Sequence, residues 1–301
     1  MKSFSKVLIV ISILFNTITG FSQYDKPLVR FGLIADIQYG DQNTRGSRFY
    51  RGSIAKLDSS VNELNRQQVQ FTISLGDIVD KNPTDLDTVL QSLKRLDHTV
   101  HHVTGNHDYS GVTDNEALYK KLGMPNEYYS FKKKKWRFIF LNTNEVASYA
   151  NVTGTWKEKE LMDLFATIKA NNGKNATDYN GGISSKQVQW LEQVLKKAEK
   201  KGEKVLIFSH HPFSCAEGLT VLNDKTVLAM IAQYKSVKAL IAGHHHAGGF
   251  CYAAGLPCII AEGMVETGDK NAYGVVELYP DKLVLTGYGR MTSRVIEFNN
   301  K

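Results

Sequence analysis

Short apolar segments alternate with longer amphipathic segments along most of the chain. Residues 29–36 read VRFGLIAD, an apolar run that ends in an acid and predicts a buried strand. Residues 47–67 place apolar side chains three or four positions apart, as at Ile54, Leu57 and Val61, which predicts an amphipathic helix. The same patterns predict strands over 71–77, 136–142, 204–212, 238–246, 258–261, 274–278 and 282–288, and a strand that leads into a loop over 99–108. They predict helices over 83–96 and 184–202.

Polar side chains that suit metal binding or proton transfer follow several of these predicted strands. Strands and helices that alternate are typical of layered α/β folds, whose chemistry lies in loops beyond the carboxyl ends of the strands. A single acid or histidine at such a place is usually a turn or hydrogen-bonding residue, but five successive junctions together favour a functional site. The junctions carry Asp36, Asp77, Asn106 with His107, His210, and the run His244–His246.

The first residues follow a different pattern. Lys2 and Lys6 precede an apolar stretch over 7–15, and small and polar residues follow, which is typical of a secretory signal. The apolar stretch is shorter than the roughly 20 residues that span a membrane. We therefore expect a signal peptide over 1–22, a single domain over 23–301, no stable membrane span after cleavage, and a secreted or periplasmic protein. An uncleaved anchor is the alternative.

Charge and cysteine content change this picture little. The net charge is +7, and the densest basic cluster, 132–135, precedes an apolar strand. This position favours an exposed hairpin or strand edge over a nucleic-acid surface, and no nucleic-acid-binding motif is evident, so we expect no nucleic-acid partner. Cys215, Cys251 and Cys258 allow one disulfide, and their spacing leaves open whether any two of them pair.

The side chains at the strand ends suit two divalent metal ions. Imidazole, carboxylate and amide oxygen match manganese, iron, zinc or cobalt, whereas the chain has no thiolate cluster. Two ions about 3.5–4 Å apart can bind a phosphoryl group and lower the pKa of a water molecule. Asp77 is the candidate bridge, because a carboxylate between two cations reduces their repulsion.

At these residues the chain resembles the calcineurin-like metallophosphoesterase superfamily. Five signatures occur in order: ADIQ (35–38), GDIVD (76–80), GNHD (105–108), SHHP (209–212) and GHHH (243–246). The resemblance implies a four-layer α/β/β/α sandwich, in which helices flank two mixed sheets.

The resemblance also implies a role for each matching residue. The first metal would be held by Asp36, Gln38, Asp77 and His246, and the second by Asp77, Asn106, His210 and His244. His245 would be a spacer. His107 would face the substrate as an acid–base or phosphate-stabilising group, and Asp80 would orient it. The residues alone leave His107 open as a metal ligand.

A narrower resemblance extends over most of the chain. Segments 179–191, 243–252 and 262–290 look like those of manganese-dependent ADP-ribose/CDP-alcohol diphosphatases. The last segment carries most weight, because metal binding does not demand its placement of glycines and charges.

The narrower resemblance implies substrates and a cofactor. The substrates would be small nucleoside diphosphate conjugates: ADP-ribose would give AMP and ribose 5-phosphate, and CDP-choline would give CMP and a phosphorylated alcohol. Manganese is the favoured metal. The alternative activities are a broader metallophosphodiesterase, including cyclic nucleotides, or a phosphomonoesterase of the same fold. A binding protein that has lost catalysis is disfavoured, because all the candidate ligands are present.

Three further residues are candidates for the substrate pocket. We expect Gly182 and Cys251 to shape it, with a tight turn and a packed thiol as the alternatives. His211 stands where the family pattern leads us to expect an apolar residue, and we expect it to change the fit of the leaving group.

Overall fold

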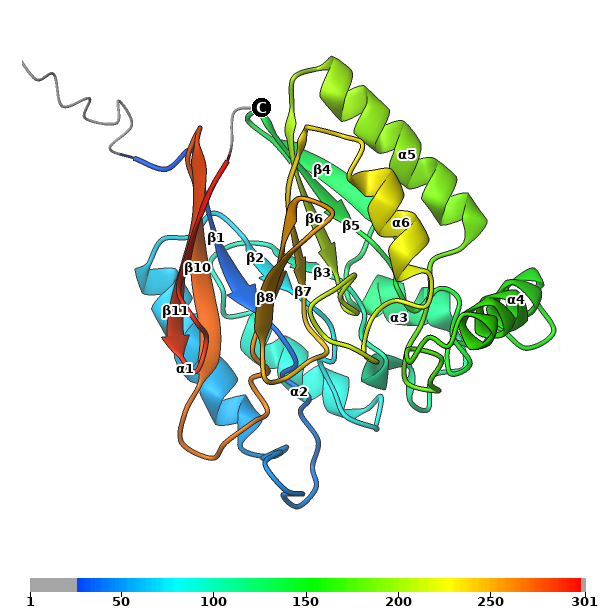
Figure 1. Cartoon of the computed structure of the whole chain (residues 1–301). Coiled ribbons are helices and arrows are strands. Elements are labelled where there is room, and N and C mark those ends of the chain that lie inside the picture. The colour runs from blue at the N-terminus through cyan, green and yellow to red at the C-terminus, as the bar shows by residue number, and fades with distance from the viewer. Residues whose placement is uncertain (1–25, 299–301) are drawn as a thin grey trace, which may run out of the picture.

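The computed structural model describes residues 26–298, so the signal peptide predicted over 1–22 lies outside the described residues. Two six-stranded mixed sheets pack face to face, and helices cover their outer faces (Figure 1). This arrangement confirms the predicted α/β/β/α sandwich.

The first sheet has the strand order β12-β11-β10-β1-β2-β3. Its strands are β1 (Val29–Ile34), β2 (Thr72–Ser74), β3 (Val100–His102), β10 (Ala272–Leu278), β11 (Lys282–Gly289) and β12 (Arg294–Glu297). Strands β1, β2 and β3 are parallel, and helices α1 (Ser53–Arg66) and α2 (Asp85–Leu93) connect them. The loops that follow these three strands therefore emerge at one edge.

The second sheet has the order β4-β5-β6-β7-β9-β8. Its strands are β4 (Tyr129–Lys133), β5 (Trp136–Phe140), β6 (Lys204–Ser209), β7 (Val237–Ala242), β8 (Gly249–Ala253) and β9 (Leu256–Ile260). Helices α5 (Ser185–Lys200) and α6 (Asp224–Ile231) pack on its outer face. The Ser184 side chain caps α5 by accepting from the main-chain N–H of Gln187.

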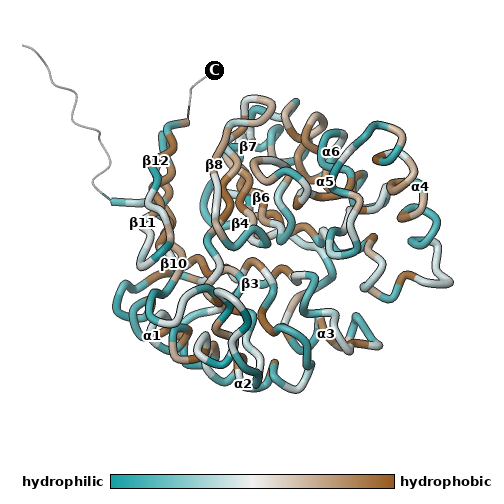
Figure 2. Tube along the Cα trace, turned by 60° about the horizontal axis from the view of Figure 1, so that its bottom comes forward, coloured by the Kyte–Doolittle hydropathy of each residue, from teal (hydrophilic) through white to brown (hydrophobic). Residues whose placement is uncertain are grey.

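Alternate residues of the central strands face two different cores, because successive strand side chains point to opposite faces. Phe138 and Phe140 of β5 pack with Phe31 in the core between the sheets. Ile139 and Leu141 pack with the helices that cover the second sheet. Figure 2 shows the apolar segments, in brown, along the strands of both sheets and the polar segments, in teal, on the connections.

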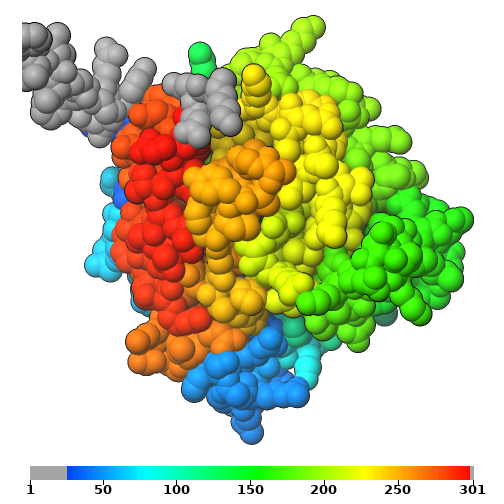
Figure 3. Space-filling model, viewed as in Figure 1, coloured from blue at the N-terminus to red at the C-terminus, as the bar shows by residue number. Residues whose placement is uncertain are grey.

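Several boundaries differ from those expected. The helix predicted from residue 47 begins at Ser53. The residues before it form an irregular segment, in which the main-chain N–H of Phe49 donates to the carbonyl of Val265 at 2.9 Å. In Figure 3 this blue segment lies against the orange segment that follows β9. A tertiary contact thus replaces the first helical turns.

The lysine cluster at 132–135 lies at the β4–β5 hairpin, and β4 is an edge strand, as predicted. Elements that the pattern did not predict are β4, β8, β12, α3 (Asn115–Lys121), α4 (Trp156–Ala170), α6 and a short 3₁₀ turn, η1 (His107–Tyr109). Helix α4 packs on a small separate cluster that includes Val146 and Val152.

A disulfide joins Cys215, in the loop after β6, to Cys251 of strand β8, and Cys258 is a buried free thiol. Within residues 26–298, no helix combines the length and apolar character that a membrane span requires.

Candidate active site

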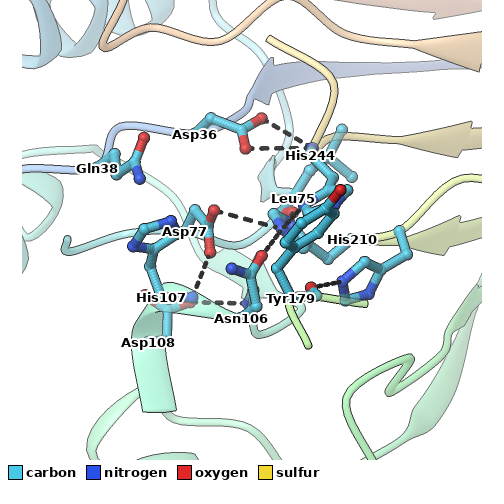
Figure 4. Close-up of polar contacts among 12 residues, drawn as sticks. Asp36, Gln38, Leu75, Asp77, Asn106, His107, Asp108, Tyr179, His210 and His244 are labelled. Atoms are coloured by element: carbon cyan, nitrogen blue, oxygen red, sulfur yellow. Dashed lines mark hydrogen bonds and ion pairs between the residues drawn. The ribbon is translucent and has the colours of Figure 1, made fainter. Parts of the chain in front are cut away.

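The candidate metal ligands lie where the two sheets meet, in loops after five strands (Figure 4). Asp36 and Gln38 follow β1, Asp77 follows β2, Asn106 follows β3, His210 follows β6, and His244 and His246 follow β7. The structure thus brings all seven predicted ligands to one place.

One group of donors surrounds His210. Its Nδ1 lies 2.8 Å from the carbonyl of Leu75, to which it can donate. Its Nε2 faces Oδ1 of Asn106 at 3.1 Å, Nδ1 of His244 at 3.2 Å and Oδ2 of Asp77 at 3.4 Å. Four polar atoms therefore converge where only a shared positive charge, a proton or a metal ion, can satisfy them together.

A second group contains Asp36, Asp77 and His246, whose ligand atoms lie within 4.8 Å of one another. Nε2 of His246 lies 3.4 Å from Oδ1 of Asp36. Its Nδ1 contacts Oε1 of Glu266 at 2.7 Å, an arrangement that commonly orients a metal-binding histidine.

Gln38 completes the second group. It is fully buried, and its Oε1 has no hydrogen-bond partner. Its Nε2 donates to Oδ1 of Asp80 at 2.9 Å, so the amide orientation is defined. An unpartnered buried carbonyl oxygen beside two carboxylates fits a cation ligand, because burial without a partner is otherwise costly. The residues present therefore fit metal ions at both groups.

Four of these residues have left-handed backbones. The φ angles of Asp36, Gln38, Asp77 and His244 are 49°, 44°, 49° and 69°. Such conformations cost about 1–3 kcal/mol each in non-glycine residues and cluster at functional sites. Main-chain hydrogen bonds hold them, including one from Gln38 N–H to the carbonyl of Asp77 at 2.7 Å.

The carboxylates and imidazoles strongly affect one another. Burial disfavours a charge on His210 and His246, but Asp77 and Asp36 outweigh it and raise the pKa of each ring to about 9. Burial likewise opposes ionisation of Asp77, but His210 and His107 hold its pKa well below the usual range. The site is thus built to hold positive charge, and cations would compete with protons for it.

His107 lies at the rim of the same centre. Its main-chain N–H, not its ring, contacts Oδ1 of Asp77, at 2.8 Å. Its Nδ1 lies 2.8 Å from the carbonyl and 3.2 Å from the carboxylate of Asp80. Burial opposes a charge on the ring, but Asp77 and Asp80 outweigh it and raise the pKa of His107 to about 9. The geometry leaves Nε2 as the nitrogen available to a bound molecule.

A cavity of about 400 Å³ opens beside these donors. It is lined by Arg48, Asp77, Asn106, His107, Tyr179, Leu219, His244, His245, His246, Ala247 and Glu266. A larger hollow of about 570 Å³ between segments 171–175 and 214–225 contains none of the candidate ligands, so we place the functional site at the smaller cavity.

Sequence reasoning missed Arg48, Tyr179, Leu219 and Glu266. Arg48 and Glu266 come from distant segments that form an antiparallel bridge, with 3.8 Å between their charged groups. The narrower resemblance contained the only available signal, because Tyr179 and Glu266 lie in two of its segments.

The three candidates for the substrate pocket are not among the residues that line the cavity. Gly182 is buried and exchanges main-chain hydrogen bonds with Val146. His211 is fully buried, with Nδ1 2.9 Å from Oγ1 of Thr143 and Nε2 3.1 Å from the carbonyl of Tyr179. Cys251 is bonded to Cys215 instead of presenting a thiol.

The segment 262–290 encloses His246. A Cβ at Gly263 would lie 2.9 Å from Cγ of His246, and Arg290 donates to the main-chain oxygens of Gly263 at 2.9 Å and of His246 at 3.4 Å. Gly263 and Arg290 of this segment therefore pack directly on a candidate ligand.

Comparison with known proteins agrees with this geometry. The model of the calcineurin-like phosphoesterase family matches residues 29–248. The chain therefore belongs to the calcineurin-like phosphoesterase family, a family of metallophosphoesterase hydrolases.

The narrower resemblance is confirmed too. Manganese-dependent ADP-ribose/CDP-alcohol diphosphatases from Danio rerio and Homo sapiens are 31% and 29% identical to this chain. The alignments cover 91% and 93% of this chain, and 100% and 96% of those proteins. The crystal structure of a dimetal phosphatase from Danio rerio superposes with a TM-score of 0.83 at 30% identity, covering 91% of this chain and 100% of that one.

Proposed function

We propose that the protein uses two divalent metal ions, with manganese favoured, to cleave the pyrophosphate of ADP-ribose and of CDP-alcohols such as CDP-choline. The products are a nucleoside monophosphate and a phosphorylated product. The observation that carries the proposal is the convergence of seven donor side chains, including the unpartnered Oε1 of Gln38, beside a cavity of ligand size. The names of the relatives support the substrate class.

Two groups of side chains would hold the ions. Asp36, Gln38 and His246 form one group, Asn106, His210 and His244 form the other, and Asp77 lies beside both. Bound ions would neutralise phosphate charge and supply an activated water.

The other side chains would contact the substrate or orient a residue that does. The Asp80 carboxylate and carbonyl orient the His107 ring, which can give a proton to the departing phosphate oxygen through Nε2. Arg48 at the cavity wall adds a positive group that suits a pyrophosphate. Tyr179, which is 43% exposed, offers an aromatic surface at the rim.

A substrate panel tests the proposal. Purified protein is assayed with ADP-ribose, CDP-choline, 2′,3′-cyclic AMP and p-nitrophenyl phosphate, each with added Mn²⁺, Fe²⁺, Zn²⁺ or Co²⁺. We expect the two diphosphate conjugates to give the highest kcat/KM, and Mn²⁺ to give the highest rates. Slower turnover of these conjugates than of the cyclic nucleotide or the phosphomonoester would contradict the proposed specificity in favour of a broader phosphodiesterase or a phosphomonoesterase.

We propose further that the protein works outside the cytoplasm, on nucleotides of the periplasm or the medium. The signal-like pattern over residues 1–22 supports this location, and so does the disulfide, since disulfides persist mainly in oxidising compartments. Fractionation of the native cell, with mass spectrometry of the mature N-terminus, tests it. Recovery of an uncleaved chain in the cytoplasm would contradict it.

A further inference from the structure

The sequence Asn180–Gly181–Gly182 contacts the candidate metal centre through His244. Asn180 is fully buried, and its Oδ1 lies 3.2 Å from Nε2 of His244. Its Nδ2 donates to the carbonyls of Asn175 at 2.9 Å and Gly218 at 2.8 Å. Because these carbonyls can only accept, the nitrogen of the amide must face them and the oxygen must face His244.

The orientation of Asn180 decides which nitrogen of His244 carries the hydrogen. An amide oxygen only accepts, so Nε2 of His244 must be the donor. Nδ1 is left with a lone pair and faces Nε2 of His210 at 3.2 Å. His210 is held in a matching way, because its Nδ1 donates to the carbonyl of Leu75. Both nitrogens that face the centre are thus available to a cation.

Gly181 allows Asn180 to reach this position. A Cβ at Gly181 would lie 2.3 Å from the carbonyl oxygen of Thr143, so a larger residue would push the segment away. On its other side, the carbonyl of Gly181 accepts from Leu222 N–H at 2.9 Å. The motif is therefore clamped between two neighbouring segments, and the side chain of Asn180 is fixed by its surroundings.

We propose that Asn180 is a positioning residue that holds His244 in the tautomer with hydrogen on Nε2, and so sets the affinity of the metal position that His244 shares with His210. The inference rests on the proposed function in one respect, the use of His244 as a ligand. It assigns the NGG motif to metal retention rather than to contact with the substrate.

Metal titration of the full chain tests this role. Mn²⁺ is titrated by calorimetry into metal-free wild type and into Asn180→Ala, Asn180→Asp and Asn223→Ala. We expect Asn180→Ala to weaken one of two Mn²⁺ positions by about 10–100-fold, as is typical when the partner of a metal-binding histidine is lost. Asn180→Asp keeps the acceptor oxygen toward Nε2 of His244 but turns its other oxygen toward the carbonyls of Asn175 and Gly218, so it should recover only part of this affinity.

Asn223 provides the matched control. It is an asparagine of the same region whose amide exchanges two hydrogen bonds with the main chain of Ile183, at 2.8 and 3.3 Å, without a contact to His244. We expect Asn223→Ala to lower the stability of the fold while leaving Mn²⁺ affinity within about twofold of wild type. Equal loss of affinity in Asn223→Ala and Asn180→Ala would reduce Asn180 to a structural residue.

A second readout needs no metal. Long-range ¹H–¹⁵N NMR of ¹⁵N-histidine-labelled metal-free protein reports the tautomer of each ring. We expect His244 to carry its hydrogen on Nε2 in wild type and to lose this preference in Asn180→Ala. A hydrogen on Nδ1 in wild type, or Mn²⁺ affinity unchanged by Asn180→Ala, overturns the inference.

Different results would contradict the proposed function and the proposed role of Asn180. A wild type that binds two Mn²⁺ but does not hydrolyse the diphosphate conjugates refutes the proposed function and leaves the titration decisive for Asn180. A wild type that binds no Mn²⁺ refutes both.

Discussion

At the residue scale, Gln38 serves two neighbours with one planar group. Its oxygen is unpartnered among the candidate ligands, and its nitrogen donates to Asp80, which also contacts His107. A carboxylate at this position could offer an oxygen to a metal ion but could not donate a hydrogen bond to Asp80. A hydrocarbon side chain could do neither of these. The amide of Gln38 therefore connects a metal-ligand position, through Asp80, to the candidate acid–base residue His107. This double role gives a reason for a glutamine at position 38 although an amide oxygen is a weak metal ligand.

A histidine at position 38 would test how weakly the amide holds its ion. Imidazole is the stronger ligand for transition ions such as Zn²⁺, and its second ring N–H can still donate to Asp80. We expect Gln38→His to retain more metal than wild type after dialysis, with a larger gain for Zn²⁺ than for Mn²⁺, measured by elemental analysis. Gln42 also donates to Asp80 but is not a candidate ligand, so Gln42→Leu is the control. Retention equal to wild type in Gln38→His would count against a weak amide ligand.

Removal of the His107 ring should separate catalysis from metal binding. The contact with Asp77 comes from the main chain, so His107→Ala keeps it. We expect kcat to fall by about 10²–10⁴, the usual contribution of an acid–base group, with unchanged metal content. Steady-state kinetics and metal analysis of the same preparation check this, with His245→Ala, a change at another cavity-lining histidine, as the control. Release of metal from His107→Ala would instead make its ring a ligand.

The convergence of the seven candidate ligands could be predicted from the sequence, because each follows a short apolar strand. The side chains behind them could not. Glu266 contacts His246 from 20 residues away, and Asn180 contacts His244 from 64 residues away. Such partners depend on how distant segments pack, which local periodicity does not report.

At the element scale, Asp108 ties together the loops that follow β2 and β3. Its Oδ1 accepts from the main-chain N–H groups of Ile78 at 2.7 Å and Val79 at 3.1 Å, and its Oδ2 accepts from Gly105 at 2.8 Å. These loops carry Asp77 and Asn106, so one buried carboxylate sets the spacing of two candidate ligands.

We expect Asp108→Asn to lower the free energy of unfolding by about 1–3 kcal/mol, because an NH₂ group would then face a main-chain donor. Urea denaturation followed by circular dichroism measures the change. Asp114→Asn is the control, since Asp114 caps the exposed start of α3 and asparagine caps equally well. If Asp108→Asn lowered the free energy of unfolding no more than Asp114→Asn does, the three contacts of Asp108 would contribute little to stability.

Most central strands and the helices α1, α2 and α5 were predictable, because their apolar periodicity is strong. The start of α1 was not, since residues 47–52 pair with the segment after β9 rather than continuing the helix. Helix α4 was missed because only a small apolar cluster holds it. Strand β8 was missed because it is an edge strand whose Phe250 and Tyr252 remain exposed.

At the scale of the whole molecule, both sheets contribute to the candidate centre. Asp36, Gln38, Asp77 and Asn106 follow strands of the first sheet, and His210, His244 and His246 follow strands of the second. Bound ions would therefore link the two halves of the sandwich.

Metal removal should accordingly lower the stability of the entire fold. With free Mn²⁺ at 100 times its Kd, each bound ion adds about 2.7 kcal/mol, which corresponds to a rise in Tm of about 5–10 °C per ion. We expect calorimetry to show this difference between Mn²⁺-loaded and chelator-treated wild type. Asp77→Ala should lose metal and activity together, and its Tm should not respond to Mn²⁺. An equal response in both proteins would place the stabilising ions elsewhere.

Because a disulfide joins Cys215 to Cys251, the redox conditions under which the protein is produced affect its structure. The loop that it fastens to β8 also supplies Leu219 to the cavity and the Gly218 carbonyl to Asn180. Protein made in a reducing cytoplasm would carry two thiols in place of this link, and its loop would have more freedom. Material from an oxidising host is therefore the appropriate starting point for metal and substrate measurements, and thiol titration should precede each of them.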